Sequence, residues 1–185
     1  MKQFALLILA LVGLAQLAVP ASMIWKREQT LRHGRVWKLE TAPLDPADPF
    51  RGRYVALSFK AEEFDWPESA AVRGVGEAYL RLKNGADGFA VVAHITKEPM
   101  SGDDVIKVDR AWYYERKQRV NFPFAQLWLD ENIAPRADKA YAEHNRRGTP
   151  ARAYVTVRIR DGDAALEELF IEGKPLREYL RDAAN

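Results

Sequence analysis

Histidine and cysteine, the side chains that most often hold metal ions, are sparse in this sequence and fall into no metal-binding spacing. His33, His94 and His144 lie far apart, and none has a partner at the H-x-x-x-H spacing of a zinc site. Cysteine is absent, which excludes disulfides, iron–sulfur clusters and a cysteine nucleophile. We therefore expect no metal ion and no cofactor.

The serines and the acidic residues also have simple structural interpretations. None of the four serines lies in a G-x-S-x-G or S-x-x-K motif, so no serine nucleophile is indicated. The acidic cluster of Asp103, Asp104 and Asp109 lacks the alternating oxygen ligands and the closing glutamate of a calcium loop. These observations identify no catalytic residue, and they favour a protein that is not an enzyme.

Aromatic residues are concentrated between positions 112 and 131, which makes this region the best candidate for a binding face. Alternation along a strand would send the side chains of Trp112 and Tyr114 to the same face. Together with Trp128 and Glu131 they form a candidate ligand-binding or partner-binding face. The simpler interpretation of this region is core packing, and the sequence leaves both open.

The distribution of charge separates the first 25 residues from the rest of the chain. Residues 1–25 contain a single charged side chain, Lys2, while the 185-residue chain as a whole carries a net charge of +2. A nearly neutral chain of this kind is not expected to bind nucleic acid, because nucleic-acid binders usually carry a strong basic excess.

The uncharged run from Phe4 to Trp25 predicts a membrane anchor. As a helix it would be about 33 Å long, and the hydrocarbon core of a bilayer is about 30 Å thick. Residues 4–25 would then lie in the lipid bilayer, and residues 1–25 would form an uncleaved signal anchor. A cleaved signal peptide ending near Val19-Pro20-Ala21 is the alternative. The run continues past that point to Trp25, which favours the anchor.

Two features of the anchor disagree about the side of the membrane. Five basic residues follow the run closely, and only Lys2 precedes it, so the positive-inside count places the domain in the cytoplasm. A short N-terminal tail before a long domain is instead the usual layout for export, and long domains translocate with little regard to charge. We expect the extracytoplasmic side, against the positive-inside count.

Residues 26–185 are expected to form one domain, mainly β with one or two helices, built as a small barrel or a folded antiparallel sheet. Apolar–polar alternation and glycine turns predict most of its strands. Pro135 at a first turn and the spacing of the apolar residues after it predict the main helix. The expected strands are 36–41, 53–59, 79–83, 89–95, 105–108, 111–115, 119–124, 154–159 and 165–171, the expected helices are 136–146 and 176–183, and 60–74 is expected to be a polar loop.

A proline-rich approach and the strand that follows it form the most distinctive stretch of the chain, residues 39–59. The prolines stiffen the approach, and Asp45 or Asp48 can accept hydrogen bonds from the backbone or from Arg51. Gly52 permits a sharp entry into the strand, whose alternation puts Tyr54 and Leu57 on opposite faces. We interpret this stretch as a folding motif first and as a binding site second.

The same stretch resembles the bacterial family named for the motif G-D-Y-x-x-L-x-Y, with Gly52, Tyr54 and Leu57 at matching positions. Arg53 stands where the family name has aspartate, and Phe59 where it has tyrosine. The resemblance implies a membrane-anchored envelope protein with no established reaction. It would lie in the bacterial inner membrane as a single-pass protein with a periplasmic domain, and its partner would be a neighbouring membrane protein or envelope component.

Two alternatives to a binding or structural partner stay open. The first is a small-ligand binder or an enzyme that uses the aromatic region 112–131. The second is an inactive relative of the signal peptidases, membrane-anchored β proteins that carry an Arg-Gly-Asp step into a strand, where this chain has Arg51-Gly52-Arg53. Those enzymes need a serine before that step, and no serine lies between Ser22 and Ser58. A fold of that kind would therefore be inactive here.

Overall fold

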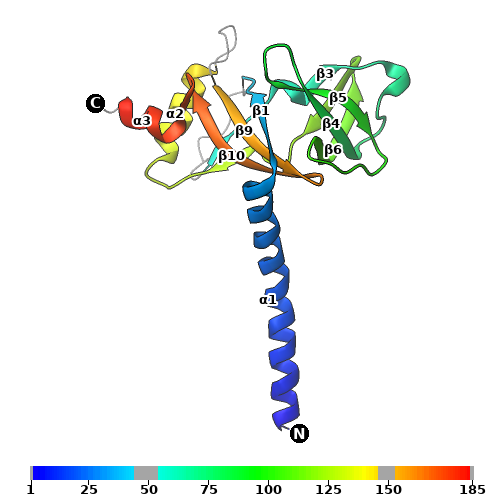
Figure 1. Ribbon diagram of the computed structural model, residues 1–185, viewed down its shortest axis with the longest axis vertical. Helices are drawn as coiled ribbons and strands as arrows, with labels where there is room; N and C mark the ends of the chain where they lie inside the picture. Colours follow the sequence, from blue (N-terminus) through cyan, green and yellow to red (C-terminus); the bar gives the residue numbers. More distant parts are fainter. Residues whose placement is uncertain (1, 44–53, 146–152, 184–185) are drawn as a thin grey trace.

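A long N-terminal helix carries a β-rich domain at its C-terminal end in the computed structural model (Figure 1). The structure describes residues 2–43, 54–145 and 153–183, except for the side chains of residues 2, 4–8 and 10. The helix, α1, runs from Lys2 to His33. Among the described residues, no helix is both long enough and apolar enough to cross a membrane. This finding does not support the membrane-spanning helix predicted for residues 4–25.

The helix α1 ends at a glycine that admits no side chain. The amide of Gly34 donates a hydrogen bond to the carbonyl oxygen of Thr30 at 2.8 Å. A Cβ atom on Gly34 would lie 2.5 Å from that oxygen, so only glycine fits without a shift of the backbone. The helix thus continues past Trp25 through residues 26–33 and ends just before Gly34.

Antiparallel ladders make up the domain, and its sheet is barrel-like and nearly closed (Figure 1). A four-stranded sheet has the order β1-β9-β10-β11, a five-stranded sheet has the order β3-β7-β6-β4-β5, and β2 pairs with β8 alone. The bounds are β1 Arg35–Glu40, β2 Tyr54–Ala56, β3 Glu63–Asp65, β4 Gly76–Asn84, β5 Ala90–Thr96, β6 Val105–Tyr114, β7 Lys117–Asn121, β8 Gln126–Trp128, β9 Ala153–Arg160, β10 Asp163–Ile171 and β11 Lys174–Pro175.

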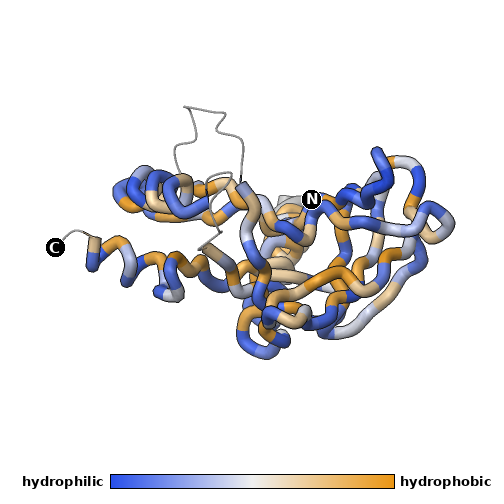
Figure 2. The backbone as a smooth tube through the Cα atoms, turned by 90° about the horizontal axis from the view of Figure 1, so that it is seen from above, coloured by the Kyte–Doolittle hydropathy of each residue, from blue (hydrophilic) through white to orange (hydrophobic). Residues whose placement is uncertain are grey.

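Two short helices close one side of the domain. Helix α2 (Ala134–His144) has a proline in its first turn, as predicted, and helix α3 (Leu176–Asp182) follows β11. Both bury apolar side chains in a core that both larger sheets share. Figure 2 shows hydrophobic and hydrophilic positions alternating along the strands around this core, as expected for strands with one buried face. The prediction of a mainly β domain with helices is confirmed.

Two sequence predictions about single elements are wrong. Residues 105–108 and 111–115 were expected to be separate, but one strand, β6, covers both. A bulge allows this, because Asp109 and Arg110 together oppose the single residue Glu77 of β4. The expected polar loop 60–74 contains the strand β3 and two 3₁₀ turns, at Lys60–Glu62 and Glu68–Ala70. The strand forms because Phe64 and its neighbours pair with β7.

Candidate functional site

The strand predicted at residues 53–59 is present as β2 and its continuation, which we call the motif segment (residues 54–59). Val55, Leu57 and Phe59 are buried in the core, while the residues between them are half-buried. This is the alternation predicted from the sequence. The other candidate motif residues, Asp45, Asp48, Arg51, Gly52 and Arg53, lie outside the described residues.

The motif segment holds a second strand in place. Tyr54, Val55 and Ala56 pair with Trp128, Leu127 and Gln126 of β8 in an antiparallel register. The ladder continues beyond the strand, since the amide of Leu57 donates to the carbonyl oxygen of Ala125 at 2.9 Å. The rings of Tyr54 and Trp128 meet with their centroids 5.1 Å apart. The first motif aromatic therefore packs on the exposed end of β8.

The second motif aromatic, Phe59, packs in the core against the segment that leads into β8. Its ring centroid lies 5.7 Å from that of Phe122 and 5.5 Å from that of Phe124, and those two rings stack on each other. All three side chains are buried. A tyrosine at position 59, as in the family motif, would bring a hydroxyl into this apolar cluster, and phenylalanine avoids the need to pair it.

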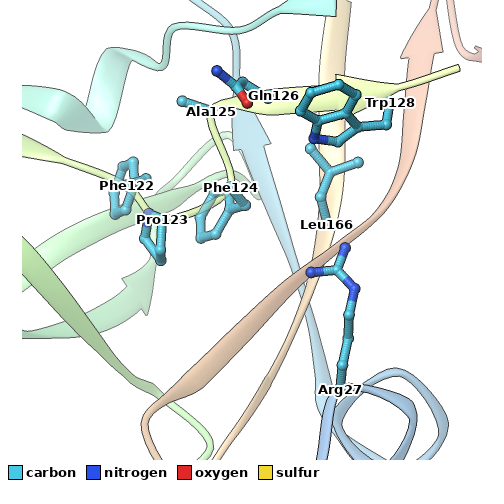
Figure 3. Close-up of a pocket in the computed structure, with 8 residues that line it drawn as sticks. All are labelled: Arg27, Phe122, Pro123, Phe124, Ala125, Gln126, Trp128 and Leu166. Carbon is cyan, nitrogen blue, oxygen red and sulfur yellow. The ribbon is translucent and has the colours of Figure 1, made fainter. Parts of the chain in front are cut away.

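A pocket of about 290 Å³ opens along the segment that the motif positions. Figure 3 shows Arg27 extending from α1 toward Leu166 and Trp128, with Phe122, Pro123 and Phe124 on the opposite side. We call this the junction pocket, because it lies where α1 meets the sheet. Its lining residues are Arg27, Phe122, Pro123, Phe124, Ala125, Gln126, Trp128 and Leu166.

Polar contacts with the β9–β10 hairpin fix the last turns of α1, and with them Arg27. Lys26 forms an ion pair with Asp163 at 2.7 Å. The guanidinium of Arg160 donates to the side-chain oxygen of Gln29 at 3.3 Å. That of Arg158 donates to the carbonyl oxygen of Gly34 at 3.2 Å. The helix is thus held along two of its turns, and the side chain between Lys26 and Glu28 is directed into the pocket (Figure 3).

The C-terminal end of the motif segment is tied down by a carboxylate. Glu62 accepts hydrogen bonds from the hydroxyl of Ser58 at 3.0 Å and from the amide of Phe59 at 2.9 Å. Burial raises the pKa of Glu62 above its usual value, and hydrogen bonds from the backbone of Phe59, from Ser58 and from the backbone of Phe122 oppose that rise. Ser58 is therefore bonded to a glutamate, whereas a signal-peptidase nucleophile would need a lysine.

A buried tyrosine and asparagine continue this network into α2. The amide of Asn145 donates to the hydroxyl oxygen of Tyr141 at 2.9 Å and to the carbonyl oxygen of Ala42, and its oxygen accepts from Thr41 at 3.2 Å. Burial raises the pKa of Tyr141 to about 12, so its hydroxyl stays neutral at any physiological pH. We call Thr41, Ser58, Glu62, Tyr141 and Asn145 the buried polar network.

The predicted aromatic face is spread over separate elements. Trp112 and Tyr114 lie on β6, where they face Arg110 at 5.3 Å and Arg119 at 5.8 Å, measured from each guanidinium carbon to the ring centroid. Trp128 lies on β8 and lines the junction pocket. Trp112, Tyr114 and Glu131 are not among the residues that line it.

His144, the last residue of α2, has structural partners. The Nδ1 atom of His144 lies 2.9 Å from the carbonyl oxygen of Ala140, and its ring packs edge-on against Tyr179. Its Nε2 atom lies 3.6 Å from a carboxylate oxygen of Glu172. In the described ranges, no group of three or more histidine or acidic side chains is arranged to hold a metal ion.

No sequence pattern indicates the buried polar network as a whole or the position of Arg27 in the junction pocket. One local signal was present for Glu62, which stands three residues after Phe59, the spacing of a capping box. The partners Thr41 and Asn145 are 104 residues apart, and no local pattern links them. Arg27 was counted only among the bases that bear on membrane orientation.

Comparison with known proteins gives one result. A family model described as GDYXXLXY protein matches residues 16–169, which is most of the chain and includes the motif segment and β8. No curated protein and no solved structure gives a match.

Proposed function

This chain belongs to the GDYXXLXY protein family, and from that premise we propose that it is a non-catalytic, membrane-anchored domain of the bacterial envelope that binds a neighbouring membrane or envelope component. The observation that carries the proposal is the exposure of apolar side chains along α1. Its large apolar side chains are exposed along the helix, with Ile24 at 71% and Trp25 at 66%. Exposing such side chains to water costs about 1.5–3 kcal/mol each, so the helix is more stable in an apolar environment than in water.

The bilayer fits this helix better than a protein partner does. The apolar side chains are exposed on all sides of α1 rather than along one stripe, as the list of Leu9, Leu11, Leu14, Leu17, Val19, Met23 and Ile24 indicates. A partner helix would leave most of that surface in water, whereas lipid surrounds a helix completely. The sequence extends the uncharged run back to Phe4, through positions whose side chains lie outside the described set.

The junction pocket supports binding rather than catalysis. It combines one guanidinium with aromatic and aliphatic side chains and backbone. Catalysis of acyl or proton transfer needs a nucleophile or a general base within hydrogen-bond reach of the substrate. The residues that line this pocket supply neither, and the half-buried Glu62 is occupied as a hydrogen-bond acceptor for the motif segment.

A small-ligand binder is the second candidate, and one observation favours it. The junction pocket is close to the lower end of the size range of small-molecule sites, and Trp128 lies in it with 65% of its surface exposed. A ligand stacking on Trp128 would raise the thermal unfolding temperature of the purified domain. Stabilisation by a soluble metabolite without any membrane component would favour this candidate over the first.

Membrane attachment is tested by extraction of the full chain from cell membranes. We expect the protein to resist carbonate and high salt and to be released by detergent, because apolar contacts survive those washes and ionic contacts do not. Release by carbonate would contradict the anchor. Replacing Leu14 and Leu17 by lysine is the matched variant, since it puts two charges in the run and should abolish retention.

We propose the periplasmic side for the domain, and a reporter fusion tests it. A reporter that is active only outside the cytoplasm is fused after Asn185, next to an equivalent fusion of a reporter active only inside. We expect activity from the first and silence from the second. The reverse result, with both fusions stable, would place the domain in the cytoplasm as the positive-inside count predicts.

The partner is tested by crosslinking in intact membranes followed by mass spectrometry. We expect a recurrent crosslinked membrane or envelope component that is lost when Trp128 and Tyr54 are both replaced by alanine. Replacing Tyr114, an exposed aromatic on β6 outside the pocket, should leave that product unchanged. Recovery of monomer alone would contradict the binding role.

A further inference from the structure

We propose that the junction pocket binds the headgroup phosphate of an anionic phospholipid, with Arg27 as the ligand of the phosphate and Trp128 packed beside the glycerol. This inference rests on the membrane anchoring proposed above and names the component that the pocket takes. It gives the motif segment a task, which is to hold the aromatic wall of the pocket opposite Arg27.

The described residues around Arg27 do not neutralise its positive charge. Its neighbours on α1 are paired, Lys26 with Asp163 at 2.7 Å and Arg32 with Glu28 at 2.6 Å. For Arg27, the described part of the chain offers no carboxylate partner. The pocket that it enters is lined by no acidic side chain. An unpaired guanidinium facing aromatic and backbone groups selects a phosphate, which it binds through two parallel hydrogen bonds.

The position of Arg27 along the helix matches the headgroup layer. Trp25 lies two residues earlier, which is about 3 Å along the helix axis. Tryptophan prefers the membrane–water interface, so a helix anchored at Trp25 brings Arg27 to the level of the lipid phosphates. The exposed ring of Trp128 lies beyond Leu166 as seen from Arg27 (Figure 3) and supplies an aromatic surface in the same pocket.

The size and lining of the pocket point to a headgroup rather than to a whole lipid or a peptide. About 290 Å³ is near the lower limit of small-molecule sites, so acyl chains would stay in the bilayer. Phe122 and Phe124 are buried and form a fixed wall, since Phe59 packs against both. The pocket is therefore pre-formed, and binding requires little reordering of the protein.

Photocrosslinking in lipid nanodiscs tests the inference with the full chain. The crosslinker p-benzoylphenylalanine replaces Gln126, which lines the pocket, and the discs contain equal parts of phosphatidylcholine and phosphatidylglycerol. After irradiation, mass spectrometry identifies the lipid attached at position 126. We expect phosphatidylglycerol to exceed phosphatidylcholine by about fivefold, as one cation near a membrane surface contributes about 1 kcal/mol toward an anionic lipid.

Three variants sharpen the result. Arg27→Gln should return the lipid ratio to that of the disc, and Arg27→Lys should keep part of the preference. Arg32→Gln removes the same charge five residues further along α1, outside the pocket, and should leave the preference intact. Because Arg27 lies at an open surface, circular dichroism of the variants should match that of the unmodified protein.

The outcomes separate this inference from the proposed function. Failure of the protein to enter the discs overturns the anchoring, and this inference with it. Entry into the discs with lipid crosslinks in the mixing ratio, or with protein crosslinks only, overturns the headgroup site and leaves the anchoring in place. Loss of the lipid product on addition of inorganic phosphate also overturns it, because the pocket would then be a general anion site.

Discussion

The two ends of the motif segment, six residues long, have opposite surroundings. At its start, the half-buried Tyr54 packs on the exposed Trp128 at the junction pocket, which Arg27 also lines. At its end, Phe59 is buried in the core, and Ser58 and Phe59 donate hydrogen bonds to the half-buried carboxylate of Glu62. A strand alternates faces at every residue, so one short element serves a surface and a core together. Under the proposed function, the motif segment therefore combines an end that serves binding with an end that serves folding.

The largest expected difference between the two ends concerns packing. Phe59→Ala removes a buried ring from the cluster with Phe122 and Phe124, and aromatic truncations of this kind cost about 3–5 kcal/mol of unfolding free energy. Urea denaturation followed by circular dichroism measures the loss. The matched change at the other end, Tyr54→Ala, should cost far less. Equal losses of unfolding free energy in the two variants would contradict the difference between the two ends.

The buried polar network should show the next largest effect. Asn145→Ala leaves the carbonyl of Ala42 and the hydroxyl of Tyr141 without their amide partner, whereas the hydroxyl of Thr41 keeps its hydrogen bond to the carbonyl oxygen of Ala153 at 2.7 Å. An unsatisfied buried group costs about 1–3 kcal/mol, so we expect a loss of about 2 kcal/mol in urea denaturation. Asn132→Ala, at an exposed asparagine, serves as the control and should change the stability little. If Asn145→Ala lost no more unfolding free energy than the control, the network would not stabilise the C-terminal end of the motif segment.

The pH dependence of stability should reveal Glu62. Because its pKa is raised in the folded protein, the folded state holds this proton more tightly than the unfolded state does. The stability that Glu62 contributes is therefore fully present below its unfolded pKa of about 4.5 and is lost as the pH rises through the folded pKa.

The measurement is the difference between the unmodified protein and Glu62→Gln, with urea denaturation at several pH values from 4 to 8. The difference cancels carboxylates with the opposite slope, such as Glu63 and Asp182, whose pKa values are lowered by ion pairs with lysine. We expect the glutamine variant to gain in relative stability as the pH rises. A difference that is flat with pH would mean that burial does not perturb the carboxylate.

The smallest expected effect is the coupling between the half-buried Tyr54 and the exposed Trp128. The ring centroids of Tyr54 and Trp128 are 5.1 Å apart, Trp128 is exposed and Tyr54 is half-buried, and such pairs contribute about 0.5–1.5 kcal/mol. A double-mutant cycle with alanine at both positions measures the coupling. We expect about 0.5 kcal/mol in stability together with loss of the crosslinked component. A coupling as large as the loss in Phe59→Ala would mean that this end also belongs to the folding core.

Local patterns in the sequence were sufficient for most of the fold. The alternation at Val55, Leu57 and Phe59 predicted their buried face, and the glycine turns predicted the hairpins β4–β5 and β9–β10. The continuity of β6 could not be predicted in the same way, because Asp109 and Arg110 in succession look like a turn. Only the opposing strand shows that they form a bulge.

The site was harder to predict than the fold, because its parts come from distant segments. Trp128 was named in advance as part of a binding face, whereas Arg27 comes from the helix at the other end of the sequence. Polar residues such as Thr41 and Asn145 look like ordinary surface residues until the chain folds and buries them together. Sequence spacing identifies partners within one element, and these partners belong to different elements.

For the proposed membrane anchor, the direct passage from α1 into β1 bears on the bilayer thickness that would suit the protein. Only Gly34 separates the helix from the strand, and hydrogen bonds from the β9–β10 hairpin fix the end of the helix. With no flexible linker, a helix longer than the bilayer cannot tilt alone, and the domain must tip with it. In a thinner bilayer, hydrophobic mismatch would therefore lift one side of the domain and draw Trp128 toward or away from the lipids. We expect bilayer thickness to change the crosslinking yield at position 126.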